Sequence, residues 1–366
     1  MGEQIFFGML ILVICYLLFI ILHPSLTLEA EAIGGDDLGS EAPDCRQTVN
    51  IELEKETISA WLYLPADQGP FPCIIMNTGF GGTKDVLMEP YALRFVENGL
   101  AVITFDYRYF GESTGSPRQL YDGIEQQEDL RAVIEFALAN SRIDSTRIVI
   151  WSTSATGRYG INAASEDPTI AGVIAQCPSL NHKLDDGIIF KREGIGYFLK
   201  LFMHMQRDKG RSRLRLTPHL IPIVGKPGTI AMMNAPEALE GYRDLMAGSK
   251  TFINGICARS LLIWPGPDAP KMAPKVRCPV LVQVCEYDTI VSKDSYKKVV
   301  AILGDKATVI RYPIGHFDIY KGSHFERAVE DQLAFIKQIF ANRPEPAGPE
   351  SILIEPESIP TDPAIV

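Results

Sequence analysis

The sequence predicts an α/β fold in which a mostly parallel, eight-stranded sheet is flanked by helices and interrupted by an inserted helical lid. Short apolar runs rich in β-branched residues alternate with longer amphipathic stretches, which is typical of a parallel sheet covered by helices. One stretch, residues 178–277, has no place in this alternation and is too long for a simple connection. The composition, 46% hydrophobic and 22% charged, is that of a chain that buries a full core.

The alternation predicts each element in turn. Strands are expected over residues 48–54, 57–64, 73–76, 101–105, 147–151, 170–175, 280–284 and 308–312. The first two are close enough to be joined by a tight turn and to run antiparallel. Helices are expected over residues 89–97, 126–139, 157–164 and 325–340, with further helical pieces at 195–205 and 236–245 inside the insertion.

These elements fall within one folded domain, expected over residues 47–342, of which 178–277 form the lid. An acidic, glycine-containing linker, residues 29–46, precedes the domain, and a tail rich in proline and glutamate, residues 343–366, follows it. Both flanking segments have too little apolar character to pack and are expected to be poorly ordered.

The amino terminus, residues 1–28, is different in kind. Residues 5–22 form an uncharged, strongly apolar run, long enough to span a bilayer. A cleaved signal peptide is the competing interpretation, because Ala30-Glu31-Ala32 resembles a cleavage site, but such peptides usually begin with a basic segment and here Glu3 precedes the run. We therefore expect a single-pass membrane anchor. Neither flank carries a nearby Lys or Arg, so the side of the membrane is left open.

Charge and cysteine content exclude other classes of protein. The net charge of −10 would repel phosphate backbones, so we expect no nucleic-acid partner. One basic run, residues 207–215, is interpreted as solvated surface. The seven cysteines include no Cys-x-x-Cys pair, so neither a metal site nor a disulfide framework is expected, and no motif indicates a cofactor.

A candidate nucleophile follows the strand at 147–151. An acyl-transfer enzyme of this architecture holds its serine on a sharp strand-to-helix turn between small neighbours. Ser154 is central in Ser-Thr-Ser-Ala-Thr, residues 152–156, directly before the expected helix. Both glycines of the usual Gly-x-Ser-x-Gly pattern are absent here. Taken by itself, this segment also fits a Ser/Thr-rich helix cap that has no catalytic role.

A base and an acid follow in the order that this chemistry needs. His316 lies in the loop after the last strand, where the general base belongs. Asp288 lies just beyond the preceding strand, where it can orient the imidazole and stabilise its charged form. Glu286 is a rival for that role, although it lies closer to the end of the strand. The order Ser154, Asp288, His316 predicts a catalytic triad.

Two amides are expected to stabilise the oxyanion that forms on the substrate. The nucleophile's next residue, Ala155, can supply one, and Phe80 in the glycine-rich segment 77–82 can supply the other. That segment lacks the Gly-Lys-Ser/Thr ending of a P-loop, so nucleotide binding is the weaker interpretation.

The chain resembles a known group of enzymes in three segments: 77–85 (NTGFGGTKD), 105–113 (FDYRYFGES) and 312–320 (YPIGHFDIY). They look like those of microbial α/β hydrolases related to dienelactone-hydrolase-like enzymes, a group that includes polyketide acyltransferases of secondary metabolism. The resemblance covers residues 52–340. It implies the α/β-hydrolase fold, and Ser154, Asp288 and His316 match the group's triad positions. The chain departs from the group's usual elbow, Gly-Thr-Ser-x-Ser-Gly-Gly, and carries Thr78 where a histidine is usual.

Three functions remain open at this point. The first is a serine hydrolase that cleaves an ester, thioester or lactone of a small, hydrophobic acyl substrate through an acyl-serine intermediate. The second is an acyltransferase, in which an alcohol or amine attacks the same intermediate. The third is an inactive binding module, suggested by the altered elbow.

Overall fold

The computed structural model describes residues 2–22, 42–86, 88–263, 266 and 268–341. Its centre is an eight-stranded sheet in the order β1-β2-β4-β3-β5-β6-β9-β10. β2 pairs antiparallel with both β1 and β4, and all other neighbours are parallel. The predicted fold class, a mostly parallel eight-stranded sheet flanked by helices, is confirmed.

The strands lie close to their predicted positions. They are β1 (Arg46–Glu52), β2 (Thr57–Tyr63), β3 (Phe71–Asn77), β4 (Ala101–Phe105), β5 (Ile143–Thr153), β6 (Gly172–Gln176), β9 (Val280–Cys285) and β10 (Ala307–Tyr312). The helices that flank them are α2 (Glu89–Glu97), α3 (Gly123–Ala139), α4 (Gly157–Glu166), α9 (Lys297–Leu303) and α10 (Gly322–Ala341).

Alternate side chains of the inner strands enter two separate cores. On β5, Val149 and Trp151 pack with residues of α2 and α10, whereas Ile148 and Ile150 pack with residues of α3, α4 and α9. This alternation follows from the period of two in a strand, which sends successive side chains to opposite faces. Both faces are covered, so the inner strands are apolar throughout and their carboxyl ends meet at one edge of the sheet.

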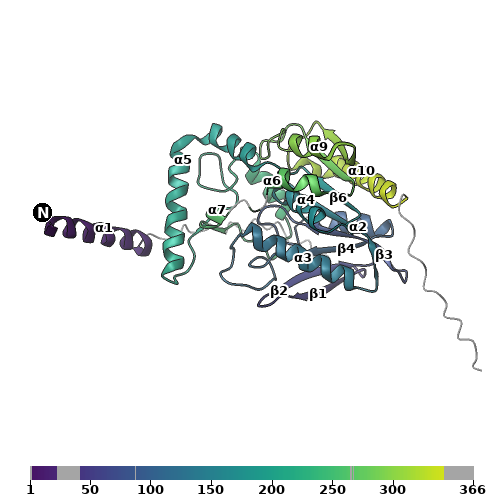
Figure 1. The fold of residues 1–366 in the computed structure, drawn as a ribbon, viewed down its shortest axis with the longest axis horizontal. Helices are drawn as coiled ribbons and strands as arrows, with labels where there is room; N and C mark the ends of the chain where they lie inside the picture. The colour runs from purple at the N-terminus through teal and green to yellow at the C-terminus, as the bar shows by residue number, and fades with distance from the viewer. Residues whose placement is uncertain (1, 23–41, 87, 264–265, 267, 342–366) are drawn as a thin grey trace, which may run out of the picture.

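The residues between β6 and β9 form most of one end of the molecule. They contain α5 (His182–Arg213), β7 (Leu220–Ile221), α6 (Ala238–Met246), β8 (Ile256–Cys257), α7 (Ser260–Ile263) and α8 (Ala269–Met272). The predicted helical piece at 195–205 belongs to the longer α5, which bends at Gly194, where φ is 72°. Figure 1 shows the second part of α5 standing beside the body, with α1 (Gly2–Leu22) extending from it away from the sheet. The lid limits 178–277 stay a prediction.

The expectation of a membrane anchor is wrong. Across the residues that the structure describes, no helix combines the length and the apolar character needed to cross a membrane. Residues 29–41 of the predicted linker and the predicted tail, 343–366, lie outside the described residues.

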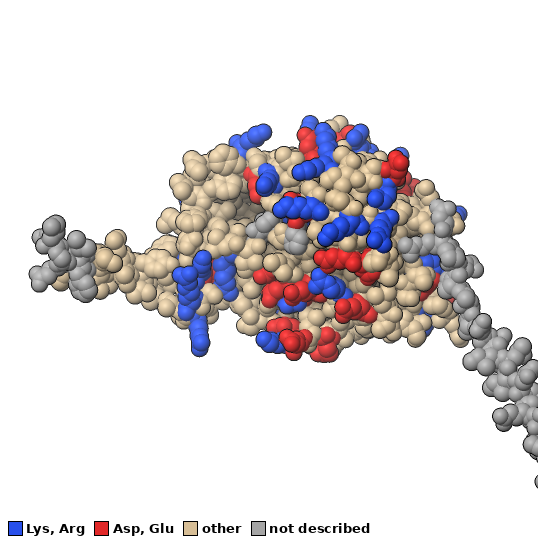
Figure 2. Space-filling view, in the orientation of Figure 1, with Lys and Arg blue, Asp and Glu red and all other residues tan. Residues whose placement is uncertain are grey.

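The end of α1 contacts α5 through the basic run at 207–215. The guanidinium of Arg211 donates a 2.9 Å hydrogen bond to the carbonyl of Ile20, and that of Arg207 lies 5.6 Å from the ring centroid of Phe19. Arg207 is buried, so the run is only partly the solvated surface expected from its charge. In Figure 2 charges of both signs are mixed over the body, whereas α1 and the upper part of α5 carry few.

Candidate active site

Ser154 lies on a sharp turn between β5 and α4. Its φ of 53° is in the left-handed region, which a serine adopts only when the surrounding structure holds it there. The preceding residue, Thr153, is extended, and residues Ser154–Thr156 form a single 3-10 turn that leads into α4. The chain therefore reverses at Ser154 and presents its side chain at the carboxyl edge of the sheet.

The structure accommodates the two residues that replace the usual glycines. Ser152 is fully buried and its Oγ accepts a 3.1 Å hydrogen bond from Nδ2 of Asn77. Thr156 has right-handed angles, φ −87° and ψ −2°, like those of the third residue of a type I turn, and its hydroxyl donates to the carbonyl of Thr153 at 2.9 Å. Room for Ser152 comes from Gly160, where an added Cβ would lie only 2.9 Å from the Ser152 Oγ. A glycine one turn along α4 thus replaces a glycine within the elbow.

The three predicted triad residues come together across three loops. Nε2 of His316 lies 3.0 Å from Oγ of Ser154, and Nδ1 of His316 lies 2.6 Å from Oδ2 of Asp288. The other oxygen, Oδ1 of Asp288, accepts hydrogen bonds of 2.8 Å from the amides of Ile290 and Val291, which fix the carboxylate. The rival Glu286 is exposed, whereas Asp288 is the carboxylate in contact with the imidazole.

The environment of His316 favours its protonated form. Burial alone lowers the pKa of a histidine, but the negative charges of Asp288, Cys177 and Glu237, together with the hydrogen bond to Asp288, outweigh it, and the pKa of His316 is raised from 6.5 to about 9. This imidazole therefore holds a proton strongly once it has taken one, which is what a base needs when it receives the proton of a serine hydroxyl.

The predicted oxyanion loop packs directly against the nucleophile. A Cβ added to Gly79 would lie 3.4 Å from the Cβ of Ser154. Residues 79–82 form a tight turn closed by a 3.2 Å hydrogen bond from the Gly82 amide to the Gly79 carbonyl. Phe80 is the second residue of this turn, and Ala155 is the second residue of the turn that opens into α4. Ala155 thus follows Ser154 directly, and Phe80 follows Gly79, the residue that packs against Ser154.

Above Ser154 lies a small, mostly apolar cavity of about 30 Å³. Its floor includes Ser154, His316 and Gly79, and its roof includes Leu245 and Met246 of α6. A space of this size holds about two or three water molecules and no acyl chain.

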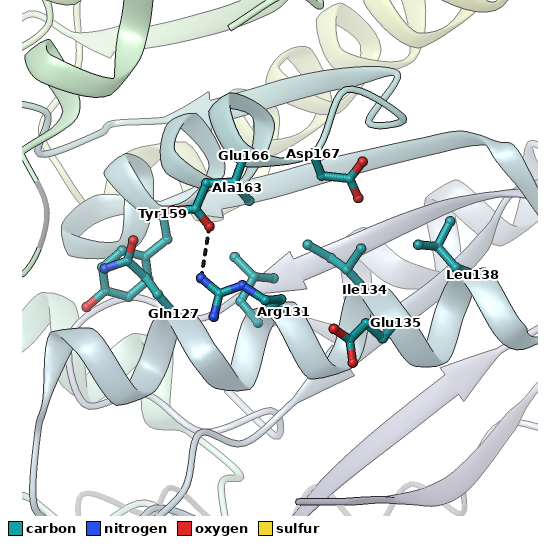
Figure 3. Close-up of a pocket in the computed structure, with 10 residues that line it drawn as sticks. Gln127, Arg131, Ile134, Glu135, Leu138, Tyr159, Ala163, Glu166 and Asp167 are labelled. Carbon is teal, nitrogen blue, oxygen red and sulfur yellow. Dashed lines mark hydrogen bonds and ion pairs between the residues drawn. The ribbon is translucent and has the colours of Figure 1, made fainter. Parts of the chain in front are cut away.

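A larger hollow of about 320 Å³ lies between α3 and α4, away from these residues (Figure 3). Leu130, Ile134 and Leu138 form one side of it, and an ion pair of 2.9 Å between Arg131 and Glu166 crosses it. None of the triad residues lines this hollow, and its size alone does not make it a functional site.

Several residues at the site were not predicted from the sequence. The roof residues Tyr242, Leu245 and Met246 come from the insertion, whose sequence carries no motif that would single them out. Tyr320 also lines the cavity, and its hydroxyl shares a short hydrogen bond with that of Thr153, the residue before the nucleophile. Tyr320 lies in segment 312–320, one of the three segments that resemble known enzymes. The sequence therefore indicates that Tyr320 is near the site, but not what it contacts there.

The fold and the arrangement of these side chains define a protein of the α/β-hydrolase class. The solved structures that it resembles agree. A complex of DcsB with its substrate analogue matches with a TM-score of 0.69 at 25% identity, over 81% of this chain and 99% of that one. The α/β hydrolase GrgF from a Penicillium species matches with a TM-score of 0.65 at 23% identity, over 81% and 99% of the two chains.

The chain belongs to the X-Pro dipeptidyl-peptidase (S15) family, whose model matches residues 56–318. The quorum-quenching protein AidA of Acinetobacter baumannii is 36% identical over 82% of this chain and 97% of its own length. The polyketide transferase ATR5 of Stachybotrys chlorohalonatus is 28% identical over 77% of this chain and 93% of its own. The predicted resemblance to hydrolases and polyketide transferases is confirmed, and so is the prediction of an enzyme that acts on ester or thioester bonds as a serine hydrolase or acyltransferase.

Proposed function

We propose that this protein cleaves an ester, thioester or lactone bond of a hydrophobic acyl substrate, with Ser154 as nucleophile. The observation that supports the proposal is the continuous hydrogen-bonded chain from Oγ of Ser154 through His316 to Asp288, with separations of 3.0 and 2.6 Å. The strained backbone of Ser154 and its position beside a buried imidazole are features of a nucleophilic serine, and a serine on the surface does not need them.

The steps of the reaction follow from this geometry. As Oγ of Ser154 bonds to the acyl carbon, its proton moves to Nε2 of His316, and Asp288 stabilises the imidazolium. The negative charge on the carbonyl oxygen is stabilised by the amides of Phe80 and Ala155. The proton then passes from His316 to the departing oxygen or sulfur, which leaves the acyl group bonded to Ser154. Water, activated by His316, releases the acid.

Acyl transfer is the second candidate. An alcohol or amine that reaches the acyl-serine would take the place of water, with the same residues in the same roles. One observation favours this alternative, namely the polyketide transferase among the relatives. The third interpretation from the sequence, an inactive binding module, receives no support from a hydrogen-bonded triad.

Labelling with a fluorophosphonate, which reacts with activated serines, tests the nucleophile. We expect the wild type to label and Ser154→Ala to show no labelling, because the hydroxyl that forms the bond is removed. Ser152→Ala is the matched control, since it removes a buried hydroxyl two residues away and keeps Ser154. Equal labelling of Ser154→Ala and the wild type would refute the proposed nucleophile.

Hydrolysis and transfer can be separated with a p-nitrophenyl or thioester acyl donor in the presence of an added alcohol or amine. Mass spectrometry of the products then gives the ratio of free acid to acylated acceptor. A ratio that does not change with the acceptor's concentration would exclude transfer to that class of acceptor.

A further inference from the structure

The oxyanion turn at residues 79–82 receives a hydrogen bond from the helix above it. The hydroxyl of Tyr242, on α6, donates a 2.5 Å hydrogen bond to the carbonyl of Phe80. Both residues are buried. This bond joins the roof of the cavity to the loop that is proposed to hold the substrate's oxyanion.

The carbonyl of Phe80 is the group that decides the conformation of this turn. Gly81, the third residue, has a φ of 66°, which is typical of a type II turn, whereas a type I turn has a negative φ there. The two types differ by a rotation of the peptide that joins the second and third residues, here Phe80 and Gly81. A hydrogen bond to the Phe80 carbonyl therefore holds this peptide in one of its two orientations. The proposed donor, the Phe80 amide, belongs to the preceding peptide, and the bond anchors it by fixing the backbone of the same residue.

Other contacts hold the same helix over the site. The ring of Tyr242 packs edge-on against Phe317, the residue after the proposed base, with centroids 5.8 Å apart. A Cβ added to the neighbouring Gly241 would lie 2.1 Å from the Phe317 ring, so α6 approaches the histidine loop as closely as a glycine allows. Ile223, which also belongs to the insertion, packs against Gly81 of the oxyanion turn. The insertion thus contacts both loops that the chemistry needs.

We propose that Tyr242 is a positioning residue, which fixes the oxyanion turn through the Phe80 carbonyl. This inference rests on the proposed function, because it assigns Phe80 to the oxyanion site. The hydrogen bond ties the backbone of Phe80 to α6, the helix that also lines the cavity at Ser154.

The variant Tyr242→Phe tests the inference, because it removes the hydroxyl and keeps the ring against Phe317. With a p-nitrophenyl ester we expect kcat to fall at least about tenfold, a smaller loss than for a direct oxyanion donor, while KM changes little. The rate constant for fluorophosphonate labelling should fall by a similar factor, since that reaction also places negative charge on an oxygen in the site. Rates are normalised to the fraction of protein that finally labels, so partial unfolding lowers the amplitude and not the rate constant.

Tyr197→Phe is the matched control. Tyr197 is also a buried tyrosine of the insertion, and its hydroxyl donates to a backbone carbonyl, that of Ala231. We expect its kcat and labelling rate to match those of the wild type. Unchanged rates in Tyr242→Phe, or equal losses in both variants, would overturn the inference. Loss of labelling in Ser154→Ala would still support the proposed function in that case, so the two failures are distinguishable.

Discussion

At the scale of single residues, the pKa of His316 connects the geometry of the site to a measurable pH dependence. The imidazole accepts a proton from Ser154 only in its neutral form. Since Asp288 and the more distant charges of Cys177 and Glu237 raise the pKa of His316 to about 9 against the effect of burial, this neutral form increases as the pH rises toward that value. The same shift stabilises the folded protein fully below pH 6.5, and that contribution is lost as the pH rises through about 9.

We therefore expect kcat/KM to rise with pH well above the range of an ordinary histidine. In Asp288→Asn the negative charge is gone, so the rising limb should move to lower pH, while the rate falls about 10³–10⁴-fold because the imidazole loses its orientation and charge partner. A pH profile of kcat/KM for both proteins measures the two effects. Glu286→Gln, which removes the exposed rival carboxylate, should change neither, and a shift of the limb in that variant would contradict the assignment of Asp288.

At the scale of elements, the turn from β5 to α4 shows how an unusual elbow sequence is accommodated. Gly160 lies one turn into α4, and an added Cβ would approach both Ser152 Oγ and Val173 Cγ1 to 2.9 Å. These atoms belong to the inner strands β5 and β6, which cannot shift easily. The space that the elbow needs is therefore supplied by the helix.

Gly160→Ala should destabilise the protein by about 1–3 kcal/mol, because its methyl group forces α4 away from the sheet. Urea unfolding followed by circular dichroism measures the change. Gly196→Ala is the control: that glycine lies on α5 with open space around it, and alanine there favours the helix. Equal stability of Gly160→Ala and the wild type would show that Ser152 has space that does not depend on Gly160.

The same elements show what a sequence alone can predict. The strands can be predicted because a buried parallel sheet requires apolar runs, and α4 because it follows the turn that carries Ser154. Ser154, Asp288 and His316 can be predicted because each follows a strand at the edge where such strands end. The partners of these residues, such as Gly160 for Ser152 and Tyr242 for Phe80, are distant in the chain and have no periodic signal. Only the folded structure brings them together.

At the scale of the whole molecule, Asp85 joins the insertion to the loop between β3 and α2. Its carboxylate accepts hydrogen bonds from the amides of Lys250 and Thr251 at 2.8 and 3.1 Å, and from the hydroxyls of Ser249 and Thr251 at 2.8 and 2.9 Å. Burial raises the pKa of an aspartate, but these bonds and one from Thr83 outweigh it and lower the pKa of Asp85. The stability that the carboxylate contributes is present above its ordinary pKa of 3.8 and is lost as the pH falls through the lowered value.

Asp85→Ala should therefore cost about 2 kcal/mol of unfolding free energy at pH 7 and a smaller amount in acid, where the wild type's carboxylate is protonated. Thermal or urea unfolding at both pH values measures this difference. Asp305→Ala, an exposed aspartate beside α9, is a control that should have little effect. The same loss at both pH values would mean that the charge of Asp85 does not matter.

The cavity beneath α6 has a consequence for the choice between hydrolysis and transfer. The space beside Ser154, about 30 Å³, takes a few water molecules more readily than a bulky acceptor. Water and the acceptor therefore compete for the acyl-serine, and the acceptor's concentration sets the result. One triad could in this way produce acids in a dilute medium and acylated products where an acceptor is abundant.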